Sequence, residues 1–192
     1  QNTASPQHQA YLWLSENKDL EEYSEQRIIQ RYTMAAFYYS TNGDEWFFND
    51  DWLTDKDECE WYNKAGKRGT CSRLGQLENL ELDYNNLDGL LPPELGLLSN
   101  SVERMVMRGG PTTFTSGRIP SELGYLTRME VFFIRGNQYS GSIPTELGNW
   151  QNLEQLDLSG NKFSGPMPTE FGKFENLYLI DVSANKLTGE LP

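Results

Sequence analysis

Apolar and polar residues alternate in five short segments in the later part of the chain. The alternating apolar pairs are Leu80/Leu82, Met105/Met107, Phe132/Ile134, Leu156/Leu158 and Ile180/Val182. A period of two is typical of a strand with one buried face. We therefore predict five strands whose apolar pairs lie in the core. The residues between and after these pairs should face solvent.

The turn that follows each segment is also repeated. An asparagine recurs at Asn85, Asn137, Asn161 and Asn185, and the last two intervals are 24 residues each. Its side-chain amide can satisfy backbone groups in a turn, so stacked units would form an internal asparagine ladder. The Gly and Pro of the next element, G-x-I-P, bend the chain and end any helix. A regular period of this length predicts a repeat architecture.

The full pattern, LxxLxLxxNxLxGxIPxxLGxL, holds over most of residues 74–192. It resembles the plant-type leucine-rich repeat, whose mark is the GxIP element after the asparagine. The resemblance implies an α/β solenoid, a leucine-rich repeat horseshoe of about five repeats with a parallel β-sheet on its concave face. We predict such repeats over residues 73–192. Their Leu, Ile and Asn residues are expected to build the scaffold and to do no chemistry.

The second repeat departs from the pattern. Gly110 stands where the asparagine should be, and extra residues around Pro111–Phe114 lengthen the turn. Two interpretations remain open, a tolerated loop insertion and a projection that shapes a binding surface.

Residues 1–72 lack the repeat and predict a helical N-terminal cap, which repeat arrays need to cover their first apolar face. Ser5-Pro6 is a helix start. A stronger helix is predicted from Ser24 to Tyr39, because Ile28, Tyr32, Ala35 and Tyr39 recur at helical spacing. Asn42-Gly43 should end it.

Trp52, Cys59, Trp61 and Cys71 resemble the W…CxW…C stretch in the cap of plant-type repeat proteins. The resemblance implies that Cys59 and Cys71 form a disulfide just before the first strand, although an extra NKAGKR loop separates them here. The residues alone also allow a reduced pair or a metal site. A disulfide indicates an oxidising compartment, so we expect an extracellular or cell-surface protein. The absence of any N-x-S/T sequon predicts no N-glycosylation.

Nearly the whole chain, including YYSTNGDEWFFNDDWL, resembles the repeat proteins of diatoms and related algae. Many of those resemble receptor ectodomains or membrane-anchored surface proteins. The start of the sequence has no signal-peptide character, so either the chain is not secreted or an upstream segment is missing. Any membrane anchor is expected in a segment outside this chain.

Composition limits the chemistry. The chain of 192 residues has 16 Lys and Arg against 28 Asp and Glu, a net charge of −12, which argues against nucleic acid as a partner. One His, two Cys and no catalytic motif lead us to expect no enzyme, no metal and no cofactor. The acidic run from Asp44 to Glu60 is expected to be a solvated surface, with an adventitious divalent-cation site as the alternative.

Arginines gather at the predicted solvent-facing strand positions. The candidate ligand-binding residues on the concave face are Arg104, Val106, Arg108, Val131, Phe133, Arg135, Gln155 and Asp157. Arg and exposed aromatic residues are enriched at binding hot spots, and an acidic peptide, a carboxylated glycan or a phosphorylated group would suit them. The alternative is that the arginines pair with Glu81, Glu103, Glu130 and Asp157 on neighbouring strands.

These observations predict a non-enzymatic extracellular recognition module that binds a peptide, protein or glycan through the concave face. Two alternatives stay open, a structural subunit of an extracellular or cell-wall assembly and an inhibitor of a secreted hydrolase. Leu177, Ile180, Val182 and Leu187 belong to an apolar layer that expects another repeat. The array is therefore expected to continue, to be covered at this C-terminal edge by another chain, or to self-associate there.

Overall fold

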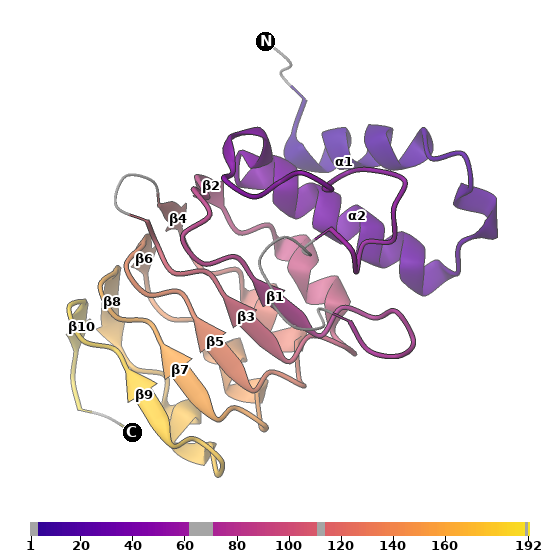
Figure 1. The fold of residues 1–192 in the computed structure, drawn as a ribbon. Coiled ribbons are helices and arrows are strands. Elements are labelled where there is room, and N and C mark those ends of the chain that lie inside the picture. Colours follow the sequence, from indigo (N-terminus) through magenta and orange to yellow (C-terminus); the bar gives the residue numbers. More distant parts are fainter. Residues whose placement is uncertain (1–3, 62–70, 111–113, 191) are drawn as a thin grey trace.

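The computed structural model describes residues 4–61, 71–110, 114–190 and 192. Two helices, α1 (Pro6–Ser15) and α2 (Glu25–Ser40), lie at one end of a stack of short strands (Figure 1). The stack leads away from them toward the C-terminus, one repeat after another. The chain is therefore a short solenoid with a helical cap.

Both predicted helices are confirmed, and each begins at a serine. The Ser5 hydroxyl accepts a hydrogen bond from the His8 amide at 3.2 Å, and the Ser24 hydroxyl accepts one from the Arg27 amide at 3.3 Å. These N-caps satisfy amides that the first helical turn leaves without partners. Short 3₁₀ helices, η1 (Leu20–Glu22) and η2 (Gly43–Glu45), follow α1 and α2 respectively.

The five predicted strands form one parallel sheet, the first sheet, in the order β1-β3-β5-β7-β9. Their bounds are β1 (Asn79–Glu81), β3 (Arg104–Val106), β5 (Val131–Phe133), β7 (Gln155–Asp157) and β9 (Leu179–Asp181). A 3₁₀ helix lies in each of the first four repeats: η3 (Pro93–Leu98), η4 (Ser121–Tyr125), η5 (Thr145–Asn149) and η6 (Thr169–Lys173). Each of these helices begins directly after the proline of the GxIP element or of its LPP counterpart in the first repeat.

A second parallel sheet was not predicted. Its order is β10-β8-β6-β4-β2 (Figure 1). The strands are β2 (Gly89–Leu90), β4 (Thr115–Gly117), β6 (Gln138–Gly141), β8 (Lys162–Pro166) and β10 (Lys186–Thr188). Each contains or adjoins the glycine of the GxIP element, and glycine weakens a strand signal. Pairing with neighbouring repeats, which a single segment does not reveal, makes these residues extended.

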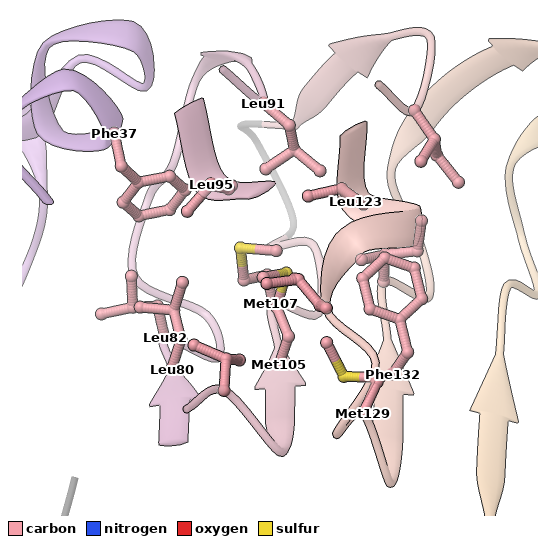
Figure 2. Packing of buried hydrophobic residues seen from close by; sticks show 14 of the residues in the cluster. Phe37, Leu80, Leu82, Leu91, Leu95, Met105, Met107, Leu123, Met129 and Phe132 are labelled. Carbon is pink, nitrogen blue, oxygen red and sulfur yellow. The ribbon is translucent and has the colours of Figure 1, made fainter. Parts of the chain in front are cut away.

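One hydrophobic core runs through cap and repeats. Figure 2 shows Phe37 of α2 reaching toward Leu95, with Leu80 and Leu82 on the strand side of the same layer. Phe37, Leu80 and Leu95 are fully buried. Burying each such side chain contributes about 1.5–3 kcal/mol. Because the two parts share this core, the division near residue 72 stays a prediction.

The asparagine ladder is present in the repeats. Asn161 Nδ2 donates to the carbonyl oxygens of Leu158 in its own repeat and Ile134 in the preceding one, both at 3.0 Å, and its Oδ1 accepts from the Tyr139 amide at 3.1 Å. Asn137, Asn161 and Asn185 thus each tie two repeats together, whereas Asn85 bonds to Phe48 of the cap. Gly110 offers no amide, and Asn137 reaches across to the Met107 carbonyl at 2.8 Å. The inserted residues 111–113 lie outside the described residues, so both interpretations of the insertion remain.

The cysteines of the cap form the expected disulfide. Cys59 and Cys71 are bonded, with 5.6 Å between their Cα atoms. The loop NKAGKR between them lies outside the described residues. Leu77 forms a bridge with Cys71 directly before the first repeat. The disulfide therefore links the cap to the point where the repeats begin.

One member of the predicted solvated acidic run is buried, which corrects the prediction. Glu58 is 2% exposed and accepts hydrogen bonds from Arg31 at 3.0 Å, Gln30 at 3.0 Å and Arg27 at 3.3 Å. Arg31 is itself fully buried. The carboxylate is buried because α2 supplies three donors that replace its water.

The last apolar pair is also less buried than predicted. Ile180 is 41% exposed and Val182 only partly buried, whereas Leu80, Met105, Phe132 and Leu156 are fully buried. β9 is the edge strand of the first sheet, so nothing described covers its outer side. The predicted uncovered apolar layer is therefore present at this end.

Candidate functional site

The predicted binding residues share the outward face of the first sheet. The register aligns them in two rows: Asn79, Arg104, Val131, Gln155 and Leu179 in one, and Glu81, Val106, Phe133, Asp157 and Asp181 in the other. Asp83, Arg108 and Arg135 follow their strands at equivalent positions. The strands therefore bring all eight predicted residues onto one surface.

Two of the eight are not accessible, contrary to the prediction. Val106 is 5% exposed and Val131 is 1% exposed. The register places Val106 between Glu81 and Phe133, and Val131 between Arg104 and Gln155. A short β-branched side chain between longer neighbours on both adjacent strands is covered by them. These valines can support the surface but present little area to a ligand.

Two of the three arginines follow the alternative of cross-strand pairing. Arg104 Nε lies 3.3 Å from Glu81 Oε1, as that alternative expected. Arg108 pairs instead with Asp83, whose carboxylate accepts from the Arg108 amide at 3.0 Å and from its Nε at 2.9 Å. The hydrogen bond to Asp83 raises the pKa of Arg108 above its ordinary value. The charge of each guanidinium is therefore partly offset by a carboxylate of the same chain.

Arg135 differs from the other two. Its side chain is exposed and forms no hydrogen bond or salt bridge with the residues that the structure describes. Phe133, two residues earlier, is partly exposed. The charge of Arg135 contributes to the lowered pKa of Asp181, which is due chiefly to hydrogen bonds from Ser183. Arg135 and Phe133 are therefore the part of the predicted site where an exposed guanidinium without a salt bridge to the described residues lies near a partly exposed ring.

The acidic and amide members of the site are held by local hydrogen bonds. Asp157 Oδ1 accepts from the Ser159 hydroxyl at 2.6 Å and from the Ser159 amide at 3.0 Å. Gln155 donates to the hydroxyl of Tyr178 on the next repeat. These contacts hold Asp157, which is aligned with Phe133, and Gln155, which is aligned with Val131, within the protein.

Two features of this side of the molecule were missed. Four glutamates stack at the N-terminal ends of successive strands of the first sheet: Glu78, Glu103, Glu130 and Glu154. Three exposed aromatic residues, Phe47, Phe48 and Tyr84, lie where the cap meets the first repeat. The glutamates could have been found by aligning the repeats. The exposure of Tyr84 itself was expected, since it follows the first apolar pair. Its departure from the pattern shows on alignment, because three later repeats carry glycine at its position and the fifth carries Ala184.

No described group of three or more His, Cys, Asp or Glu side chains is arranged to hold a metal ion. Two hollows, of about 280 and 330 Å³, lie in the cap, and none of the eight predicted residues lines them. Among the described residues, no helix has the length and apolar character needed to cross a membrane.

The repeats match a family model. The model described as Leucine Rich Repeat matches residues 76–98 and 152–174, which contain β1 and β7. Parallel strands, an asparagine ladder and this match agree with one another. The fold is that of leucine-rich repeat proteins.

Solved leucine-rich repeat structures resemble the chain. The BIR2 ectodomain from Arabidopsis thaliana is 23% identical with a TM-score of 0.70, over 82% of this chain and 80% of that one, and shows likeness of fold. A chain in the BIR3–SERK2 complex from the same plant is 27% identical, with a TM-score of 0.60 over 70% of this chain and 68% of that one.

A third similar structure is the Arabidopsis receptor kinase HAESA in complex with the peptide hormone IDA and the co-receptor SERK1. It is 37% identical with a TM-score of 0.55 over 60% of this chain, which spans 19% of that chain. No curated protein matches the sequence. The three structures named here are from Arabidopsis, so the resemblance to algal proteins stays a prediction.

Proposed function

We propose that this chain is an extracellular, non-enzymatic recognition module that binds a peptide or protein segment on the outward face of the first sheet. The observation that carries the proposal is the pair Phe133 and Arg135, one partly exposed aromatic ring beside one exposed guanidinium without a salt bridge in the described residues. Arg and aromatic side chains dominate binding energy at interfaces.

The similar structures support this proposal. HAESA was solved with a peptide hormone and a co-receptor, and BIR3 with SERK2. The disulfide and the likeness to the BIR2 ectodomain support an extracellular location. We further propose that Arg135 receives a carboxylate of the ligand, from an acidic peptide or a carboxylated glycan. Anchoring to a membrane would need a segment outside this chain.

The size of the surface limits the ligand. Strands lie about 4.8 Å apart, so the five strands of the first sheet span about 20 Å. That length accommodates roughly six residues of an extended peptide. A folded protein partner, which needs about 800 Å² on each side, would also have to use surface beyond the strands.

The test uses random peptides displayed on phage and selected on the wild-type chain. We expect Arg135→Glu and Phe133→Ala each to weaken the selected peptides by about tenfold without lowering the melting temperature. Arg135→Glu should also reduce the dependence of affinity on salt, since the attraction it removes is electrostatic.

Arg128→Glu is the matched control. Arg128 is also exposed, but it lies before β5 and pairs with Glu103. Peptides that keep wild-type affinity for the Arg135 and Phe133 variants, or that lose as much with the control, would show that the ligand binds elsewhere.

A further inference from the structure

Three large aromatic side chains are exposed at the junction of cap and first repeat. The exposed fractions are 64% for Phe47, 55% for Phe48 and 56% for Tyr84. We call these three residues the aromatic rim. They come from separate parts of the chain, the loop after η2 and the turn after β1. Large aromatic side chains usually lie in the core. A group of them exposed at one place on the surface indicates an interaction site.

Hydrogen bonds hold the two segments of the rim together. Asn85 Oδ1 accepts from the Phe48 amide at 2.7 Å, and Asn85 Nδ2 donates to the Phe48 carbonyl at 3.2 Å. The Phe47 amide donates to the Asn85 carbonyl at 3.4 Å, and Asn86 Nδ2 donates to the Glu45 carbonyl at 2.7 Å. The first ladder asparagine therefore presents the phenylalanines beside Tyr84, and the arrangement does not depend on the rings themselves.

Tyr84 occupies a backbone position that does not favour it. Its φ is +52°, in the left-handed region. The equivalent residues Gly136, Gly160 and Ala184 have φ of +70°, +65° and +51°. Glycine adopts this conformation readily, whereas a residue with a Cβ does so at a cost. The Arg108 guanidinium lies 5.7 Å from the centre of the Tyr84 ring and fixes its place. The first repeat thus keeps an exposed ring where folding favours glycine.

The surroundings of the rim carry negative charge. Residues 40–55 and 78–103, which include the rim, contain eleven Asp and Glu and no Lys or Arg. Asp51, Glu81, Asp83 and Glu103 of this set pair with basic residues elsewhere in the chain. Among the rest, Asp44, Glu45 and Asp88 are exposed. Arg108, the basic residue that lies over the Tyr84 ring, is paired with Asp83. An apolar surface with acidic surroundings complements an apolar side chain flanked by positive charges.

We propose that the aromatic rim is a docking surface for a cationic polypeptide segment with an aromatic or aliphatic anchor residue. The anchor packs against the rings, which supply large contact area with little loss of side-chain freedom. Lys and Arg on either side approach the carboxylates and the faces of the rings, where a cation is attracted. This surface is separate from Phe133 and Arg135, and the inference does not rest on the function proposed for them.

The test is a titration of the isotope-labelled chain with a short synthetic peptide that has one tryptophan between lysine and arginine residues. We expect the amide shifts in the NMR spectrum to concentrate in residues 44–48 and 83–88. Two control peptides, one with glutamate for each basic residue and one with alanine for tryptophan, should bind at least about tenfold more weakly.

Variants separate binding from folding. Tyr84→Gly and Phe48→Ser should each weaken the basic peptide by about tenfold, and Tyr84→Gly should not lower the melting temperature, because glycine suits the backbone there. Tyr125→Ser is the matched control, since Tyr125 is 63% exposed in η4 of the second repeat. Undetectable binding, shifts spread elsewhere, or equal losses in the Tyr125 variant would overturn the proposal. Dilution without peptide that moves the same amides would also overturn it, because a second copy would then occupy the rim.

Discussion

Arg31 is a fully buried charge in the cap. Its guanidinium bonds to Glu58 Oε2 at 3.0 Å, to Asn17 Oδ1 at 2.9 Å and to the Thr54 carbonyl at 2.8 Å. It also lies 5.1–5.3 Å from the ring centres of Trp13, Tyr23 and Trp61. One side chain thus connects α1, α2 and the loop that leads to the disulfide.

Removing this charge should be costly. Arg31→Met leaves the buried Glu58 carboxylate with Arg27 as its remaining cation, so we expect a loss of about 3–5 kcal/mol in the free energy of unfolding. Arg31→Met combined with Glu58→Met should lose less than the single variant, because no buried charge is then uncompensated. Chemical denaturation measures both.

The control for this prediction is the exposed pair Arg128–Glu103. Arg128→Met should change the free energy of unfolding by less than about 1 kcal/mol, since an exposed ion pair is screened by water. A loss in Arg31→Met no larger than in this control would contradict the role given to the buried network.

The sequence contained part of this information. Arg31 follows Ile28 by three residues, on the helix face whose spacing predicted burial. A charge on that face indicates a buried partner, but the partner, Glu58, stands in an acidic run that looked like solvated surface. Val106 and Val131 show the same error, since they too were expected to be exposed and are buried. Strand alternation predicts which face a side chain occupies and not what its cross-strand neighbours cover.

At the level of the strands, four glutamates stack one above another where the strands of the first sheet begin. The amide of each later glutamate bonds to the carbonyl of the one before it, at 2.7–2.8 Å along Glu78, Glu103, Glu130 and Glu154. The four glutamates therefore occupy neighbouring backbone positions on adjacent strands. Burial raises the pKa of Glu130 above the ordinary glutamate value, and the charges of Glu103 and Glu154 raise it further, while Arg104 and Arg128 oppose the shift.

A raised pKa makes ionised Glu130 unfavourable to the fold. The cost is absent below the ordinary pKa, grows as pH rises through the raised value and is complete above it. Glu130→Gln should therefore increase the free energy of unfolding at neutral pH, by about 0.2–1 kcal/mol. The gain should shrink toward zero in acid, where Glu130 is protonated, whereas high salt should remove only the part due to the charges of Glu103 and Glu154.

Thermal melts across a pH series test this, with Glu175→Gln as the control. Glu175 is exposed and lies outside the stacked set, so its replacement should change stability little at any pH. A gain for Glu130→Gln that is the same in acid as at neutral pH would show that the ionised state of Glu130 is not its cause.

The sequence predicted the first sheet and both helices because their signals are local. Alternating apolar residues, serine caps and the asparagine period are each read within one segment. The second sheet depends on pairing between repeats, as when Ser140 aligns with Lys162 and Gly141 with Phe163. Its strands contain or adjoin the glycine of the GxIP element, which weakens the strand signal, so no single repeat indicates them.

At the scale of the whole molecule, the cap and repeats give two surfaces of different character. The outward face of the first sheet offers Phe133 and Arg135, and the aromatic rim offers three rings in acidic surroundings. The fold was predicted from the repeat pattern, and the disulfide from resemblance to known caps. The rim was not, because exposure of Phe47 and Phe48 follows from how the cap loop docks on Asn85, a contact 37 residues apart.

The last described strand of the first sheet, β9, presents apolar side chains to solvent. Ile180 is 41% exposed and Leu179 40% exposed on the edge strand β9. Asn185 is the last asparagine of the ladder among the described residues. The amides of Thr115, Tyr139 and Phe163 each bond to the next asparagine along the stack, and Leu187 is the equivalent residue in the last repeat. An edge with unpaired strand groups and apolar side chains favours association.

We expect the 192-residue chain to self-associate through this edge as its concentration rises, and a fused repeat with a polar outer face to prevent it. Burying Ile180 beneath that repeat should raise the free energy of unfolding by up to about 1.5–3 kcal/mol. Light scattering over a concentration series, with thermal melts of both chains, measures the two effects.

Ile180→Lys should weaken association with little change in stability, because the Ile180 side chain is already partly exposed to solvent. Tyr125→Lys, at an exposed site away from the edge, should change neither association nor stability. A chain that stays monomeric at every concentration and melts at the same temperature with and without the added repeat would show that water covers this edge without penalty.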